Sequence, residues 1–418
     1  MNKLTIIVTY YNAEEYITGC LESIKQQRTQ DFNLIIVNDG STDQSKKLMD
    51  EAIKDYDKNI RFIDLDENSG HAHARNIALE EVETPYFMFL DADDELASYA
   101  ITFYLEKFNN TDGLIAPIHS FTTQRPQFVD LDRVRVEYFN AKGNINSFLR
   151  KQSACNIIFR TAIVRAHHIR FNENLNTYVD WSFVLEYMKY VNKFVRIFNF
   201  PFYFRGEVYD PFETLTLSEQ NFDILFKDYV NSFYDAIKRA TNPKVREFIV
   251  TKMGNKIANE FEPTRYDINE RYQTHKDTLV ELSKFLHVHL VKNQKLINKI
   301  ETILLMNNET DKAFKVNQFR KTLRHVKNIV LRRKNKERSL YDLTDKEDNV
   351  KPKTIVFESF GGKNYSDSPK YIYEYMQKYY PNYRYIWSFK NPDKNVVPGS
   401  AEKVKRNSAE YYQAYSEA

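Results

Sequence analysis

Hydrophobic and amphipathic segments alternate through the first hundred residues. Four continuous apolar stretches predict strands buried on both faces, at 4–8, 32–37, 60–64 and 87–90. Between them, apolar residues recur at the spacing of one helix face, over 13–25, 44–55 and 71–81. This alternation predicts an α/β fold with a doubly wound, mostly parallel sheet.

Polar residues follow each predicted strand at its C-terminal end: Tyr11, Asn12, Asp39, Asn68, Arg75, Asp91 and Asp93. Because these ends of parallel strands meet at one edge of a sheet, we expect a ligand crevice there. Asp91 and Asp93 could share a divalent cation that neutralises a diphosphate, although an acidic turn would give the same stretch. Neither G-x-G-x-x-G nor G-x-x-x-x-G-K-S/T is present, which argues against a dinucleotide or P-loop site.

Four of these segments together resemble a known signature. They are VTYYN at 8–12, VNDGSTD at 37–43, NSG at 68–70 with ARN at 74–76, and FLDADD at 89–94. Their order and spacing are similar to those of family 2 glycosyltransferases, whose fold is GT-A. Thr9 departs from the family, which usually has proline there.

The resemblance implies a site for a UDP-sugar. Thr9 and Tyr11 would border the nucleoside, and Asp39 would accept a hydrogen bond from the uracil ring NH. Asn68 and Arg75 would lie near the ribose and diphosphate. Asp39 could instead be a turn former, and Arg75 could belong to an ion pair on a helix surface.

The same resemblance identifies Asp91, Ala92 and Asp93 as the family's D-x-D motif. Asp91 and Ala92 would contact the nucleotide sugar. Asp91 and Asp93 would hold Mn²⁺ or Mg²⁺, with Asp93 as the more direct ligand.

Two later positions complete the implied site. The family has an acidic pair before an aromatic residue, and the second acid is the catalytic base. Here Val179 replaces the first acid and Asp180 keeps the second place. Asp180 could also cap the helix predicted at 181–190, and the two roles can coexist. Arg205 could help to hold the diphosphate, or could be an exposed loop arginine.

The organisation after residue 215 changes twice. We predict a glycosyltransferase domain at 1–215, a helical linker domain at 216–345 and a third segment at 346–418. Within the linker, a basic amphipathic helix at 319–338 is suited to an anionic membrane surface. A solvated helix, or one packed on another domain, explains it equally well, and nucleic acid is a weaker interpretation.

The third segment has an apolar stretch at 354–357, a glycine loop at 361–362 and a second stretch at 385–389. It resembles the start of the polyol-phosphate polymerases of teichoic acids and capsules, which use CDP-glycerol or CDP-ribitol and have a GT-B fold. Two strands are too few for such a domain. We therefore expect an incomplete GT-B-like α/β segment and assign it no CDP-polyol activity.

The composition of the chain limits the class of protein to which it can belong. The 418 residues include 30 Phe and 29 Tyr, enough for substantial cores, and mean hydropathy is −0.60. No apolar run approaches the roughly 18 residues of a membrane span, and no signal peptide is evident. The well-separated Cys20 and Cys155 suit a reduced cytoplasmic protein, and a net charge of +3 does not imply nucleic acid.

These observations favour an inverting, metal-dependent hexosyl- or N-acetylhexosaminyltransferase. The donor would be a UDP-sugar, and the acceptor a polyol-phosphate polymer of the teichoic acid or capsule type. Val179 and Thr9 favour an alternative, a non-catalytic polymer-binding or scaffold module with a degenerate site. Phosphotransfer of the haloacid dehalogenase type would need Thr or Val where Glu95 stands.

Overall fold

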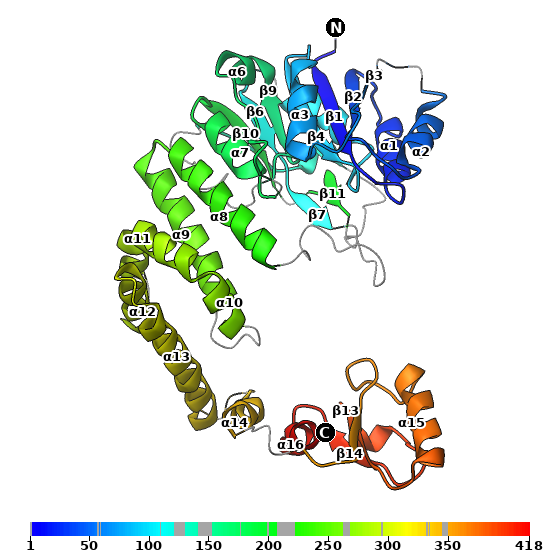
Figure 1. The fold of residues 1–418 in the computed structure, drawn as a ribbon. Helices are drawn as coiled ribbons and strands as arrows, with labels where there is room; N and C mark the ends of the chain where they lie inside the picture. Colours follow the sequence, from blue (N-terminus) through cyan, green and yellow to red (C-terminus); the bar gives the residue numbers. More distant parts are fainter. Residues whose placement is uncertain are drawn as a thin grey trace. The chain divides into compact units, whose positions relative to one another are not determined.

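The computed structural model describes most of the chain, in two compact units that comprise residues 1–253 and 254–418 (Figure 1). The residues described are 2–56, 58, 60–108, 110–120, 130–140, 153–175, 177–198, 200–206, 222–261, 268–293, 296–331, 333, 335–344 and 350–418. Each unit is described by itself.

The first unit is built on an eight-stranded sheet with the order β3-β2-β1-β4-β9-β6-β10-β8. Its first four strands are parallel: β1 (Leu4–Tyr10), β2 (Phe32–Asn38), β3 (Ile60–Asp64) and β4 (Tyr86–Asp91). The helices between them are α1 (Ile17–Lys25), α2 (Ser45–Ile53) and α3 (His71–Glu80). The predicted doubly wound α/β fold is thus confirmed.

The other half of the sheet is mixed. It contains β6 (Gly113–Ile115), β8 (Val136–Asn140), β9 (Ile157–Arg160) and β10 (Lys193–Ile197). Strand β9 runs antiparallel to β4 and β6. Three helices and a short 3₁₀ turn accompany these strands: α4 (Ala100–Lys107), η1 (Leu131–Arg133), α6 (Thr161–Ala166) and α7 (Asp180–Met188).

A second, three-stranded sheet has the order β5-β11-β7, formed by β5 (Glu95–Leu96), β7 (Ile118–Ser120) and β11 (Tyr203–Arg205). Strands β6 and β7 are separated by only two residues, yet they belong to different sheets. Pro117 lies between them and has no N–H to donate to a ladder. The turn sends the chain from the central sheet toward the edge where β4 ends.

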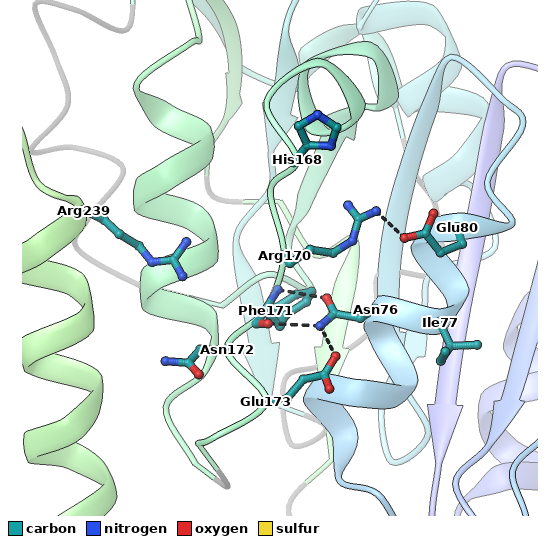
Figure 2. A pocket seen from close by; sticks show the side chains of 9 residues that line it. All are labelled: Asn76, Ile77, Glu80, His168, Arg170, Phe171, Asn172, Glu173 and Arg239. Carbon is teal, nitrogen blue, oxygen red and sulfur yellow. Dashed lines mark hydrogen bonds and ion pairs between the residues drawn. The ribbon is translucent and has the colours of Figure 1, made fainter.

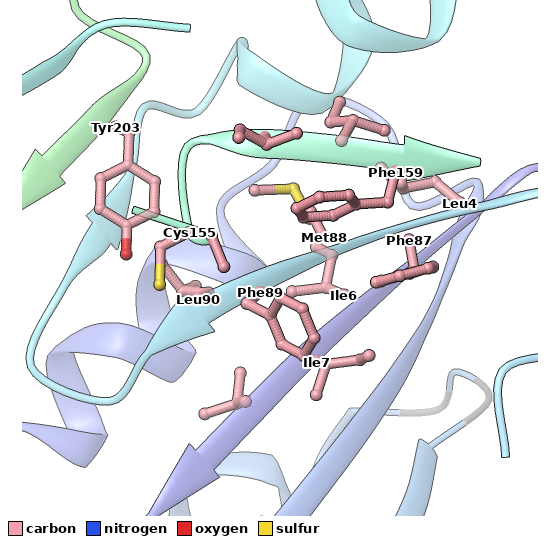
Figure 3. Packing of buried hydrophobic residues seen from close by; sticks show 14 of the residues in the cluster. Leu4, Ile6, Ile7, Phe87, Met88, Phe89, Leu90, Cys155, Phe159 and Tyr203 are labelled. Atoms are coloured by element: carbon pink, nitrogen blue, oxygen red, sulfur yellow. The ribbon is translucent and has the colours of Figure 1, made fainter. Parts of the chain in front are cut away.

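An aromatic core supports the end of β4 (Figure 3). Phe87 stacks on Phe159 of β9, with ring centroids 5.3 Å apart, and Phe89 meets Phe171 edge to face at 5.4 Å. Phe171 in turn stacks on Phe183 of α7 at 4.1 Å. These contacts hold β4, β9 and α7 together, so the residues that follow β4 have a fixed base.

Helix α8 (Phe222–Arg239) and most of α9 (Pro243–Glu260) belong to the first unit, whereas the sequence suggested a division near 215. Helix α8 packs against α7. The Asp228 carboxylate accepts from the Thr177 hydroxyl at 3.3 Å, and Ser232 donates to the Tyr178 carbonyl at 2.8 Å. These bonds attach α8 to the segment that leads into α7.

The second unit continues with α10 (Ile268–Thr274), α11 (Lys276–Asn293), α12 (Leu296–Met306), α13 (Thr310–Val330) and α14 (Lys336–Thr344). The single basic helix expected at 319–338 is interrupted, because α13 ends at Val330 and α14 begins at Lys336. None of the helices in the described parts of the chain is both long and apolar enough to cross a bilayer.

The unit ends in a parallel sheet with the order β12-β13-β14, formed by β12 (Thr354–Phe357), β13 (Arg384–Phe389) and β14 (Glu402–Lys405). The sequence missed β14, because its Glu-Lys-Val-Lys sequence has the charged composition of an edge strand. Helices α15 (Asp367–Tyr379) and α16 (Ala409–Glu417) and the 3₁₀ turn η3 (Pro392–Lys394) complete it. Trp387 is fully buried, stacked on Phe357 at 5.4 Å.

Glu417 of α16 predicts acid sensitivity of this sheet. Hydrogen bonds from Lys351, Gln413 and Arg384 lower the pKa of Glu417 from 4.5 to about 2. The stabilisation is therefore present above about pH 4.5 and is lost as the pH falls toward about 2. Since both cations are partly exposed, Glu417→Gln is expected to cost only about 1 kcal/mol at neutral pH. Thermal unfolding between neutral pH and about pH 2 should show a shallower acid dependence for Glu417→Gln; an unchanged profile would contradict this.

Candidate active site

The loops after β1, β2 and β3 meet at the C-terminal edge of the sheet. Asp39 is buried, donates its backbone N–H to the Tyr10 carbonyl at 2.9 Å and accepts from the Ser69 backbone at 2.9 Å. Gly40 has a positive φ of 69°, and a Cβ there would lie 2.6 Å from the Asn68 nitrogen. The close approach requires glycine at this position and brings the 39–40 and 67–70 loops together.

The other predicted nucleoside contacts lie on the same edge. Thr9, near the end of β1, is paired with Asp91 of β4. Tyr11 follows β1 with its side chain 44% exposed, so its ring is available to a ligand. Asn68 is exposed, and its side chain accepts from the Gly70 backbone at 3.0 Å, which shapes the turn into α3.

Three carboxylates cluster where β4 ends. Asp91, Asp93 and Asp94 each contribute one carboxylate oxygen to a group whose members lie within 4.8 Å of one another. Ala92, between Asp91 and Asp93, is buried. Burial and the neighbouring Asp91 raise the pKa of Asp93 to about 6. Burial, Asp91 and Asp93 raise the pKa of Asp94 to about 8. Carboxylate oxygens held this close repel one another, and a divalent cation bound between them would relieve that repulsion. Hard oxygen ligands of this kind suit such a cation.

Asp94, which the sequence analysis did not single out, connects this cluster to β11. It accepts hydrogen bonds from the Tyr203 hydroxyl and from the Gly206 backbone, the latter at 2.8 Å. A Cβ at Gly206 would lie 2.1 Å from the Asp93 carbonyl oxygen. Arg205 is exposed and close enough for its charge to act on Asp93. The loop expected beyond Arg205 lies outside the described residues.

Arg75 joins the cluster to Asp180. Its guanidinium donates to Asp91 and to Asp180, at 2.7 Å each, and lies over the rings of Phe89 and Phe171 at 5.2 and 5.3 Å. Arg75 is buried and its two carboxylate partners are partly exposed, so the contacts form an ion-pair triad and not the surface pair considered from the sequence. The link to Asp180 could not be predicted from the sequence, because Asp180 lies 105 residues after Arg75.

Asp180 is the first residue of α7, and its carboxylate does not cap that helix. Val179 is the N-cap residue and makes no side-chain cap. The second Asp180 oxygen accepts from the Ala154 backbone at 2.9 Å. Asp180 is thus oriented by Arg75 and Ala154, whereas Val179 is buried in the hydrophobic core.

Two further buried groups border the triad. Cys155 donates its Sγ–H to Asp91 Oδ2 at 3.1 Å, and burial raises the pKa of its thiol, which keeps the proton on sulfur. The second of these groups is His71, the first residue of α3. Burial and then Arg75 lower the pKa of His71 to about 4, while the charges of Asp180, Asp91 and Asp39 act on the same ring. Those three carboxylates therefore lie near enough to His71 for their charges to oppose the effect of burial on its pKa.

A hollow of about 570 Å³ lies on the other side of α3 (Figure 2). Asn76 fixes one wall by bonding the Phe171 backbone and Glu173, and Arg170 pairs with Glu80 across it. Arg239 of α8 points into it. Its positive and negative side chains balance, and none of the candidate site residues lines it.

The comparisons with known proteins agree with this geometry. Residues 5–168 match the model described as "Glycosyl transferase family 2". Residues 5–168 form a family 2 glycosyltransferase domain. Residues 340–418 match the model described as "CDP-Glycerol:Poly(glycerophosphate) glycerophosphotransferase", in agreement with the resemblance found for the third segment.

Curated relatives of the glycosyltransferase domain come from several bacteria. It is similar to glycosyltransferase GlyA of Streptococcus pneumoniae, 38% identical over 25% of this chain and 15% of that protein. The poly(ribitol-phosphate) β-glucosyltransferase of Bacillus spizizenii is 34% identical over 26% of this chain and 18% of its own length. The poly(ribitol-phosphate) β-N-acetylglucosaminyltransferase TarS of Staphylococcus aureus is 28% identical over 44% of this chain and 32% of its own length. The chain thus spans well under half of these relatives.

Solved structures confirm the GT-A fold. S. aureus TarS 1–349 in complex with UDP-GlcNAc superposes with a TM-score of 0.58 at 18% identity, over 76% of this chain and 90% of that one. The complex of the same protein with UDP gives a TM-score of 0.55 over the same shares.

Proposed function

We propose that this chain transfers a sugar from a UDP-sugar to a hydroxyl of a polyol-phosphate polymer, with inversion at the anomeric carbon. The observation that carries the proposal is the Asp91–Arg75–Asp180 triad beside Asp39. The triad links Asp91, a carboxylate assigned to the cation, to Asp180, the candidate base. Asp39, the candidate for nucleoside recognition, lies at the same edge of the sheet. The β-transferases of poly(ribitol-phosphate) among the relatives support the acceptor class and the inverting outcome.

Asp180 would act as the base. An acceptor hydroxyl forms the new bond to the anomeric carbon as the bond to the UDP oxygen breaks, and Asp180 takes the hydroxyl proton. Each Asp180 oxygen accepts one hydrogen bond, from Arg75 or from Ala154, and has a second lone pair to offer. Those two bonds fix the direction of the lone pairs, which is what general base catalysis requires.

The donor would be held across the rim of the sheet. Asp39 is positioned to accept from the uracil ring, Tyr11 to cover the nucleoside and Arg205 to approach the diphosphate. Asp93, with Asp91, would hold a divalent cation such as Mn²⁺ or Mg²⁺, which when bound neutralises the departing diphosphate. Asp94 has both oxygens engaged by Tyr203 and Gly206, so we assign it to positioning Gly206 against Asp93.

Asp93→Asn tests the cation site. The variant should lose most of the Mn²⁺-dependent part of UDP-sugar binding, because one carboxylate ligand is replaced by a weaker neutral oxygen; we expect a roughly 10- to 100-fold weaker affinity. Calorimetric titration of UDP-GlcNAc with and without Mn²⁺ measures this. Asp66→Asn, an exposed acid in the loop after β3, is the matched control. Equal Mn²⁺ dependence in Asp93→Asn and the parent would contradict the assignment.

A further inference from the structure

Helix α13 differs from an ordinary surface helix, which buries its apolar side and presents its polar side to water. Its inner side buries the polar Asn317 and His325 together with Ala313. The Asn317 side chain donates to the Phe261 carbonyl at 3.3 Å and to Glu301 at 3.0 Å, and Arg320 pairs with Glu301. Polar bonds therefore attach the helix to its own unit.

Its outward face is apolar. Phe319, Leu323, Val326 and Val330 are spaced by four, three and four residues, which places them within an arc of about 60°. All four are exposed, Phe319 at 56% and Val330 at 71%. A stripe of this kind in the described part of the unit is costly in water unless something covers it.

Basic residues border the stripe. By helical geometry Lys315 lies on one side of it and Lys327 on the other, and both are exposed. Arg333 and Arg338 follow, also exposed. From residue 310 to residue 338 the sequence has eleven lysines and arginines against two acidic residues. Long basic side chains beside an apolar face can reach the phosphates of a bilayer while the apolar groups enter it.

We propose that the outer face of α13 binds the surface of an anionic lipid bilayer, with Phe319, Leu323, Val326 and Val330 inserted and the flanking lysines at the headgroups. The charge of the segment is complementary to such a surface. An RNA would use the cations but would leave the apolar stripe uncovered. A second copy of this helix would place its eleven basic residues against the eleven of the first, and the like charges would repel. The bilayer satisfies both features of the helix, and the proposal does not depend on the sugar-transfer reaction.

Flotation with vesicles tests this. The 418-residue chain should float with vesicles of phosphatidylcholine and phosphatidylglycerol, should remain behind with phosphatidylcholine alone, and should be released by high salt. The double variant Leu323→Glu/Val326→Glu is expected to reduce the bound fraction roughly tenfold or more. Lys327→Glu should weaken binding at least about fivefold, the equivalent of one basic residue at the headgroups.

Control measurements distinguish binding to a bilayer from misfolding, dimerisation and RNA binding. Ile372→Glu changes an exposed aliphatic side chain on α15 and should bind as the parent does. Circular dichroism and thermal unfolding establish that each variant is folded. Unchanged flotation of the double variant, or no flotation of the parent, would overturn the proposal. So would a dimer that the double variant converts to monomers, or binding of a single-stranded RNA by the parent without any binding to vesicles.

Discussion

Asp180→Asn is expected to reduce kcat for sugar transfer by about 10²–10⁴-fold, the usual contribution of a general base. Affinity for the UDP-sugar should stay close to that of the parent, since Asp180 is assigned to the acceptor hydroxyl and not to the donor. The amide can still accept a hydrogen bond from Arg75, so the triad keeps part of its geometry. What the amide cannot do is accept the proton.

Transfer to a polyol-phosphate polymer and calorimetric donor binding, measured on the same preparation, decide this. Asp277→Asn is the matched control, because Asp277 also lies in the first turn of a helix, α11, and is remote in sequence from the site. Full turnover by Asp180→Asn would exclude Asp180 as the base. A loss of donor affinity as large as the loss of kcat would assign it to donor binding instead.

Arg75→Met is expected to lower the free energy of unfolding by about 2–3 kcal/mol, because the loss of the buried Arg75 leaves the partly exposed Asp91 and Asp180 without their common cation. It should also abolish transfer, as Asp180 loses one of the two bonds that orient it. Arg75→Lys keeps the charge but cannot reproduce two bonds from one planar group, so it should recover stability only in part. Urea unfolding of the three proteins measures these differences.

A double variant tests whether Arg75 and Asp180 interact directly. If Arg75 and Asp180 interact directly, Arg75→Met should destabilise an Asp180→Asn background less than it destabilises the parent, since one unpaired charge has already been removed. Equal destabilisation in both backgrounds, or an Arg75→Met protein as stable as the parent, would contradict the ion-pair triad.

The sequence predicted the central sheet well because its strands carry their own signal. Strands buried on both faces read as continuous apolar runs, and each end of β1 to β4 matches the expected segment to within two residues. Strand β14 carries no such run. The break after Val330 was also missed, because the basic and apolar residues continue through it without proline or glycine.

For the site, the sequence could place Asp39, Asp91 and Asp93 at one edge, since β2 and β4 end there. It could not predict that Arg75 binds both Asp91 and Asp180, because that contact joins α3 to α7 through side chains. Nor could it separate Asp94 from Asp93. Their difference comes from the Tyr203 hydroxyl and the Gly206 backbone, which β11 brings from more than a hundred residues away.

A crystal structure of the chain with UDP and Mn²⁺ tests the central claim most directly. We predict the uracil ring against Asp39 and the diphosphate with its cation beside Asp93 and Asp91. UDP bound elsewhere on the chain, or a cation held by residues other than these carboxylates, would contradict it.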